Sequence, residues 1–293
     1  MMRHFRLSIV TTTVLFACSA ASGAFVDEFD NGVVQDSNGI SGFWDTLSFG
    51  GSANSIVEAG GNITFTIGDD DGSNESDFGG ASAFSNSFRP EFSFLSNQVK
   101  IEVRGIQFSS PGNPFISPNE RLMRVGFVSS GDSAFAADDA VFLRIFETGV
   151  SLRSKTNETN MNGQGTEQAS LGNLNGVGGV DLLLGPGTLG NIDYSLTAYF
   201  PSGAVAGSTS GSFAYDSSQW DQVDQSSRLL INPQELNVSG GTQFFTASLG
   251  SLSVTAVPEP SSLLAVAVAS ICCMVLRLRK SRMPVSAQHA KTA

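Results

Sequence analysis

The sequence predicts an all-β domain, a two-sheet β-sandwich or jelly roll, flanked by an N-terminal signal peptide and a single C-terminal hydrophobic helix. Three observations predict this arrangement. Apolar and polar residues alternate along many short stretches, clusters rich in Gly, Pro, Ser and Asn separate those stretches, and helical periodicity between the two ends is limited to residues 217–230. Many short strands joined by glycine-rich turns are typical of two packed sheets.

Residues 1–24 have the form of a secretory signal peptide. Arg3 and Arg6 make its beginning positive, residues 7–17 are largely apolar, and small residues precede the expected cleavage point. We therefore expect signal peptidase to cleave after Ala24. An alternative, acylation of a lipobox cysteine at Cys18, is disfavoured by the bulky residue two positions before it.

Residues 25–256 are predicted to form one exported β-sandwich domain. The segments 62–67 (NITFTI) and 99–103 (VKIEV) alternate strictly, which places apolar side chains on one face and polar ones on the other. The chain has 22 phenylalanines against two tryptophans and three tyrosines. Buried phenylalanine has no polar tip to satisfy, so it suits the interface between two sheets. Residues 217–230 are predicted to form a short helix.

The charge of this domain is strongly negative. Residues 25–257 contain 26 acidic and 9 basic side chains, a net formal charge of −17, whereas the whole chain carries −11 because its ends are basic. Such a surface repels nucleic acid and anionic membranes and attracts divalent cations. We expect no nucleic-acid partner.

Histidine and cysteine are absent from the predicted domain: they occur only at His4, Cys18, Cys272, Cys273 and His289. This excludes a disulfide, a cysteine nucleophile, a Ser-His-Asp triad and a histidine or thiolate zinc site there. An enzyme would need a carboxylate pair, as in glycoside hydrolases, and no typical spacing of such a pair is present. The sequence therefore favours a function without catalysis.

The beginning of the domain carries a family resemblance. Residues 25–30 (FVDEFD), Phe43-Trp44 and residues 56–65 (IVEAGGNITF) together resemble the first strands of concanavalin A-like lectin and glucanase domains. The resemblance implies that a terminal strand pairs near the last one, around residues 247–255, and closes a jelly roll. It also implies a carbohydrate-facing domain.

An acidic loop is the candidate calcium site. Residues 68–77 read GDDDGSNESD, and Asp69, Asp71 and Asp77 could contribute carboxylate oxygens of the kind calcium prefers. The spacing lacks the terminal glutamate of a helix-loop-helix calcium site. The alternative is a solvated hairpin tip without metal.

The two tryptophans are the candidate sugar-binding residues. Aromatic rings stack on sugar faces, so Trp44 and Trp220 could form part of a carbohydrate site. The alternative, which the general burial of tryptophan favours, is that both pack in the core or at a sheet edge.

The C-terminal region begins with the motif Pro258, Glu259 and Pro260, followed by the hydrophobic segment 263–276. Prolines at the start separate this region from the preceding domain. The fourteen residues of this segment give a helix of about 21 Å, whereas a membrane-spanning helix needs roughly 20 residues, or about 30 Å. A basic cluster, which would hold the end of the helix on the cytoplasmic side, follows at Arg277, Arg279, Lys280 and Arg282.

This order of motif, apolar segment and basic cluster resembles the PEP-CTERM sorting signal of exported bacterial proteins. The resemblance covers residues 257–282 and implies transient anchoring in the inner membrane, followed by processing by an exosortase at the motif. A polar extension, residues 283–293, departs from the usual ending of such signals. The alternative is an ordinary membrane anchor.

Together these features predict an exported bacterial protein of the cell surface or extracellular matrix, with a structural or binding role. One alternative is a calcium-assisted module that binds carbohydrate such as exopolysaccharide. A divergent glycoside hydrolase is the less favoured alternative.

Overall fold

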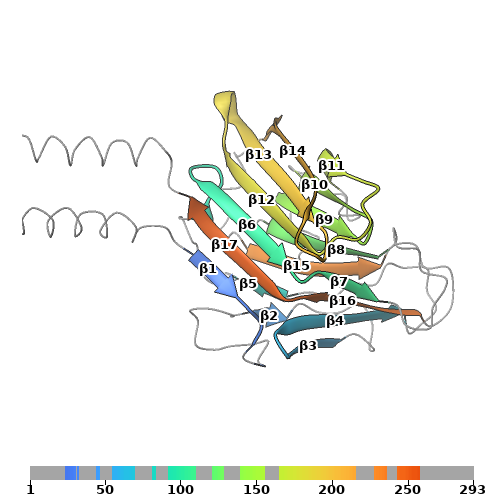
Figure 1. Cartoon of the computed structure of the whole chain (residues 1–293). Coiled ribbons are helices and arrows are strands. Elements are labelled where there is room, and N and C mark those ends of the chain that lie inside the picture. The colour runs from blue at the N-terminus through green and yellow to red at the C-terminus, as the bar shows by residue number, and fades with distance from the viewer. Residues whose placement is uncertain are drawn as a thin grey trace, which may run out of the picture. The chain divides into compact units, whose positions relative to one another are not determined.

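The computed structural model describes residues 24–30, 32, 44–46, 55–69, 81–83, 92–109, 121–128, 139–155, 165–215, 228–235 and 243–257. Residues Gly23–Val257 form one compact unit. All pairings between the described strands are antiparallel, and the strands form three sheets (Figure 1). The structure is therefore all-β with several antiparallel sheets, as expected for a β-sandwich.

The six-stranded sheet has the order β1 (Ala24–Asp27), β17 (Ser251–Val257), β6 (Gln98–Arg104), β12 (Gly179–Pro186), β13 (Asn191–Tyr199) and β14 (Val205–Ala214). The seven-stranded sheet has the order β11 (Thr166–Leu171), β10 (Gly149–Lys155), β9 (Ala140–Phe146), β8 (Arg121–Val128), β15 (Arg228–Glu235), β5 (Ala81–Ala83) and β2 (Asp45–Thr46). The four-stranded sheet has the order β3 (Ser55–Ala59), β4 (Asn62–Asp69), β16 (Gln243–Leu249) and β7 (Gln107–Ser109). A short 3-10 turn, η2 (Thr188–Gly190), joins β12 to β13.

The inward faces of all three sheets contribute to one hydrophobic core. The alternation predicted for β4 and β6 is confirmed, because their apolar positions are completely buried and the residues between them are half-buried. Those apolar positions are Ile63, Phe65, Ile67, Val99, Ile101 and Val103.

Aromatic rings connect the two larger sheets through the core. The ring of Phe94 lies 5.7 Å from that of Phe127 on β8 and 6.0 Å from that of Tyr215. The ring of Tyr215 in turn lies 6.3 Å from Phe213 on β14. This confirms that phenylalanine fills the space between sheets, where edge-to-face ring contacts add to the burial of apolar area.

The chain crosses twice between the six-stranded and the four-stranded sheet, both times at the same point. β6 continues through Gly105 into β7, and β17 follows β16 after Gly250. The N–H of Gly250 donates to the carbonyl of Arg104 at 2.8 Å. Gly105 has a φ of +66°, and a Cβ placed on it would lie 2.8 Å from the Gly250 nitrogen. Glycine is required here because the two backbones nearly touch.

Clusters rich in Gly, Pro, Ser and Asn separate the strands, as predicted, and three of them lie in hairpin turns that the structure describes. Gly60 and Gly61 form the two-residue loop between β3 and β4, and both have positive φ, as a twisted hairpin requires. Residues 200–204 join β13 to β14. Residues 187–190 join β12 to β13, and the two strands pair as an antiparallel hairpin.

The expected pairing of the first and last strands is confirmed, with one correction. β1 pairs with β17, and Phe25 lies opposite Val254. The expected last strand, residues 247–255, is in fact divided at Gly250, and its first three residues belong to β16 in another sheet. The two strands diverge there because β16 pairs with β4 and β17 pairs with β6.

The predicted helix over residues 217–230 is wrong at its end. Residues 228–230 begin β15, where Leu229 pairs with Phe127 and is completely buried. Pairing with β8 buries this side chain in the core, which outweighs the helical spacing of a few apolar residues. Residues 217–227 lie outside the described residues.

Several sequence predictions lie outside the described residues. These are residues 1–23 of the signal peptide, the motif Pro258, Glu259 and Pro260, the segment 263–276, the basic cluster Arg277, Arg279, Lys280 and Arg282, the extension 283–293, and Asp71, Asp77 and Trp220. Within the described residues, no helix has the length and apolar character needed to span a membrane.

Candidate functional site

Trp44 is a core residue. Its side chain is completely buried, and its indole N–H donates to Oδ2 of Asp27 at 2.7 Å. The ring packs edge-on against Phe25 and beside Phe29, with centroids 5.8 and 6.2 Å apart. The prediction that Trp44 stacks on a sugar is contradicted, because a buried ring presents no face to a ligand; the core alternative is correct.

Asp69 is the one candidate calcium ligand among the described residues. It ends β4, where it pairs with Gln243 of β16. The described part of the chain contains no group of three or more His, Cys, Asp or Glu side chains able to hold a metal ion. Calcium binding by Asp69, Asp71 and Asp77 therefore stays a prediction.

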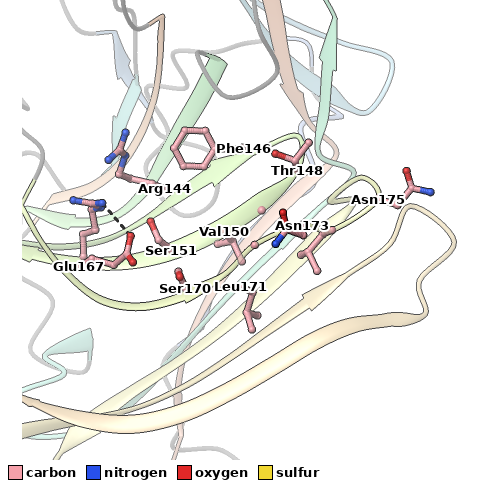
Figure 2. A pocket seen from close by; sticks show the side chains of 14 residues that line it. Arg144, Phe146, Thr148, Val150, Ser151, Glu167, Ser170, Leu171, Asn173 and Asn175 are labelled. Atoms are coloured by element: carbon pink, nitrogen blue, oxygen red, sulfur yellow. Dashed lines mark hydrogen bonds and ion pairs between the residues drawn. The ribbon is translucent and has the colours of Figure 1, made fainter.

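A groove of about 690 Å³ lies over β9, β10, β11 and the segment that follows β11. This volume is within the roughly 300–1,000 Å³ typical of small-ligand sites. Figure 2 shows Arg144, Phe146, Ser151 and Ser170 toward one end of the groove, and the asparagines of the 172–175 segment toward the other end. The groove therefore combines cationic, hydroxyl, amide and aromatic groups.

Strand alternation and register bring these groups together. On β9 the residues that face away from the core are Phe142, Arg144 and Phe146, because Val141, Leu143 and Ile145 point into it. Arg144 pairs with Ser151 of β10, and Ser151 pairs with Ser170 of β11. One row across three strands thus carries an arginine and two hydroxyls.

The segment after β11 is tied to the turn between β9 and β10. The N–H of Leu174 donates to the carbonyl of Thr148 at 2.9 Å. Asn173, next to it, has a φ of +60°, a left-handed conformation that asparagine adopts more readily than most residues. This connection fixes Asn173 and Asn175 at the end of the groove, where both lining residues are exposed.

Three arginines lie side by side on the outward face of this sheet. Arg124 of β8 and Arg144 of β9 are direct cross-strand partners, and Arg153 of β10 lies on the same face, opposite Phe142. Arg124 and Arg144 are only 3% and 6% exposed. We call Arg124, Arg144 and Arg153 the arginine cluster.

Aromatic rings and one acid accompany the arginine cluster. The Cζ atom of Arg144 lies 5.1 Å from the ring centroid of Phe146, a cation–π distance. Arg153 donates to Glu167 at 3.0 Å, and the dashed line in Figure 2 marks this ion pair. Glu167 is the one carboxylate among the residues described as lining the groove.

Burial and mutual repulsion perturb the cluster. Burial, together with the charges of Arg144 and Arg153, lowers the pKa of Arg124 to about 9. Burial and Arg153 likewise lower the pKa of Arg144 to about 10, although Glu167 opposes the shift. Both guanidinium groups still carry their charge at neutral pH, so the groove is positive in a domain whose net charge is strongly negative.

Two buried polar atoms in the groove are unsatisfied. Within the described part of the chain, neither Nε of Arg144 nor Oγ of Ser151 has a hydrogen-bond partner. Both residues are more than nine-tenths buried, and both line the groove. Buried polar groups in native structures nearly always have partners, so these two atoms are available to a ligand that enters the groove.

The outward face of the six-stranded sheet is different, because its charges satisfy one another. Lys100 contacts Glu102 at 2.8 Å and Asp181 at 3.1 Å, and Arg104 pairs with both of these acids. Tyr199 donates to Asp181 at 3.1 Å. Burial opposes the charge of Lys100, but hydrogen bonds to Glu102 and Asp181 outweigh it and raise the pKa of Lys100 above 10.5. Two positive and two negative groups balance here, so this network offers no comparable ligand site.

The sequence predictions did not single out the groove residues. Arg144 lies between two apolar residues and Arg153 follows one, and the sequence does not give the pairing of β9 with β8 and β10. One signal was present: nine basic residues occur in residues 25–257, and Arg124, Arg144 and Arg153 each lie within an apolar strand pattern. A charged side chain within an apolar strand is rarely buried unless it is paired, so it needs a partner or a ligand.

No family model matches the chain, and no curated protein matches it. Among solved structures, it is similar to a protein of unknown function from Shewanella oneidensis MR-1 (13% identity, TM-score 0.46, covering 80% of this chain and 86% of that chain). It is also similar to arcelin-5, a lectin-like defence protein from Phaseolus vulgaris (11%, 0.48, 82% and 100%), and to peanut lectin with a nine-residue peptide (11%, 0.45, 81% and 98%). All three TM-scores lie below 0.5, and the sandwich architecture follows from this chain's own strand pairing.

Proposed function

We propose that this chain is an exported bacterial protein that binds polysaccharide in the groove over β9, β10 and β11, without catalysis, at the cell surface or in the extracellular matrix. The observation that carries the proposal is the lining of the groove. The groove is lined by the phenyl ring of Phe146, the hydroxyl groups of Ser151 and Ser170, and the side-chain amides of Asn173 and Asn175. Sugars present both apolar ring faces and many hydroxyls, and this set of side chains meets both needs.

The single carboxylate in the described lining of the groove favours binding over hydrolysis. Glycoside hydrolases of the usual kind place two carboxyl groups on either side of the scissile bond. Here the described lining includes Glu167, and that side chain is held by Arg153. The described lining therefore lacks the pair of carboxyl groups that this mechanism needs.

The test is a matched pair of serine substitutions measured on immobilised polysaccharides. Ser170→Leu places bulk in the groove, whereas Ser212→Leu places the same bulk on the exposed face of β14, away from it. We expect the full-length protein in mild detergent and its Ser212→Leu variant to be retained, and Ser170→Leu to be released. Equal retention of both variants would place the binding elsewhere, and no retention of the unaltered protein on any polysaccharide would leave a structural role as the alternative.

Export is the second part of the proposal. Its support is the resemblance of residues 257–282 to a sorting signal that an exosortase recognises, together with the signal peptide over residues 1–24. β17 ends at Val257, directly before the Pro-Glu-Pro motif, so processing at the motif would leave every described strand in the released part.

Sorting is tested with the double substitution Pro258→Ala and Pro260→Ala. We expect the variant to stay in the membrane fraction while the unaltered protein reaches the surface or the medium in a shortened form. Pro201→Ala, in the turn between β13 and β14, is a control that alters a proline outside the motif. Unchanged release of the double variant would contradict sorting, and mass spectrometry of the released product would show both of its ends.

A further inference from the structure

We propose that the polysaccharide bound in the groove is acidic, and that Arg144 and Arg153, the two members of the arginine cluster that line the groove, recognise its carboxylate or sulfate groups. This inference rests on the proposed function, because it names the ligand class of the same groove. Arg144 is the central recognition residue, with Ser151 beside it as a second donor.

The first step in the argument is the position of the charges. The domain of residues 25–257 has nine basic side chains and a net charge of −17. Lys100 and Arg104, on the other large sheet, are balanced by Glu102 and Asp181. By contrast, three of the nine basic residues lie on adjacent strands of one sheet face as Arg124, Arg144 and Arg153. Like charges directly opposite each other destabilise a sheet. We therefore infer that the cluster has a function.

The second step is the state of Arg144 itself. Arg153 donates to Glu167 and to the carbonyl of Gly165, the latter at 2.9 Å, so these two contacts already orient its guanidinium group. Arg144 contacts the ring of Phe146, and within the described residues no ion pair joins it to an acid. Its Nε and the nearby Oγ of Ser151 lack hydrogen-bond partners there. A buried guanidinium presents several donors in a fixed fork, which suits the two oxygens of a carboxylate or sulfate.

The third step is access. Arg144, Ser151 and Arg153 all line the groove, and Figure 2 shows Arg144 and Ser151 near Ser170. An acidic sugar could therefore place its charged group at the arginines while its ring and hydroxyls meet Phe146 and the asparagines at the other end. A bound anion would also offset the burial and the charge of Arg153, which together lower the pKa of Arg144.

The experiment compares three polymers with full-length protein in mild detergent: a polyuronate, the same polymer after reduction of its carboxyl groups, and dextran sulfate. We expect the polyuronate or dextran sulfate to bind, the reduced polymer to bind at least tenfold more weakly, and added salt to weaken binding. The two charged polymers distinguish carboxylate from sulfate recognition.

Two variants locate the charge recognition. Arg144→Gln should lower the affinity for the charged polymer about tenfold or more, as expected for the loss of a charge-assisted hydrogen bond. Arg104→Gln, which removes the same charge from the other sheet, should change the affinity for the charged polymer by less than twofold. Arg144→Lys keeps the charge but loses the fork, so it should recover only part of the affinity. Circular dichroism of each variant shows whether it is folded.

The possible failures are distinct. If the reduced and charged polymers bind equally, and Ser170→Leu releases both, polysaccharide binding stands and the acidic ligand is wrong. If a single-stranded DNA homopolymer binds as tightly as the polyuronate, the groove is a general anion site and the assignment to an acidic sugar is overturned. If no polymer binds, both proposals fail.

Discussion

Arg124 and Arg144 lie directly opposite each other across β8 and β9, with both side chains less than a tenth exposed. Two like charges in this arrangement reduce stability in the absence of a ligand. Proteins often retain a destabilising arrangement of residues at a binding site. Replacing such a residue then often stabilises the protein.

We therefore predict that Arg144→Met stabilises the free protein while it abolishes binding of the acidic polymer. Methionine fills similar space and can still contact the Phe146 ring. The expected gain is about 1 kcal/mol, which corresponds to a rise in Tm of roughly 2–4 °C for a domain of this size. Thermal unfolding followed by circular dichroism measures the gain, and an unchanged or lower Tm would contradict the repulsion.

Asp27 should be important for the stability of the first strand. Its two carboxylate oxygens accept from the indole N–H of Trp44 at 2.7 Å and from the backbone N–H of Phe29 at 2.8 Å, both in the interior. Asp27→Ala leaves two buried donors unsatisfied and should cost about 2–4 kcal/mol in urea unfolding. Asp27→Asn keeps an acceptor and should cost less. Equal effects of the two substitutions would argue against the hydrogen bonds as the cause.

Gly105 should tolerate no side chain. Gly105→Ala combines a positive φ with a Cβ only 2.8 Å from the Gly250 nitrogen, so we expect a loss of about 2 kcal/mol or more. Gly61→Ala is the matched control, because Gly61 has a φ of +75° but nothing within 4 Å of its Cβ position. It should cost only about 1 kcal/mol. Urea unfolding of both variants separates the close approach from the backbone strain, and equal losses would contradict the close approach.

Calcium binding at the acidic loop remains to be tested by metal removal. If Asp69, Asp71 and Asp77 bind calcium, a chelator should lower Tm, and added calcium should restore it, because a ligand of the folded state stabilises that state. The double substitution Asp71→Asn and Asp77→Asn should remove this response. A Tm that is insensitive to chelator in the unaltered protein would favour the solvated hairpin tip.

The role of Trp44 shows why sequence alone left alternatives open. The sequence offered tryptophan as a sugar platform or as core, and the residue type suits both. The contact with Asp27, 17 positions earlier, selects the core, since it satisfies the indole N–H in the interior. No local pattern specifies such a contact.

The strand pattern of β4 and β6 was predictable because it is local: the period of two along the chain fixes which side chains share a face. The division of residues 247–255 into β16 and β17 was not predictable, because it depends on the close approach of Gly250 to Gly105, 145 positions apart in the sequence. The end of the predicted helix at Leu230 was wrong for a similar reason, since pairing with β8 decides the conformation of that segment.

The sequence by itself determined an all-β domain with phenylalanine in its interior, its tight turns, and its lack of histidine and cysteine, because composition and local periodicity encode these properties. Only the tertiary structure decided which strands are neighbours. That choice places Arg124 opposite Arg144 and Ser151 opposite Ser170, and so creates a positive groove in an acidic domain. The physical reason is that side-chain direction follows from the backbone period along one strand, whereas proximity across strands follows from register, which the packing of the whole core sets.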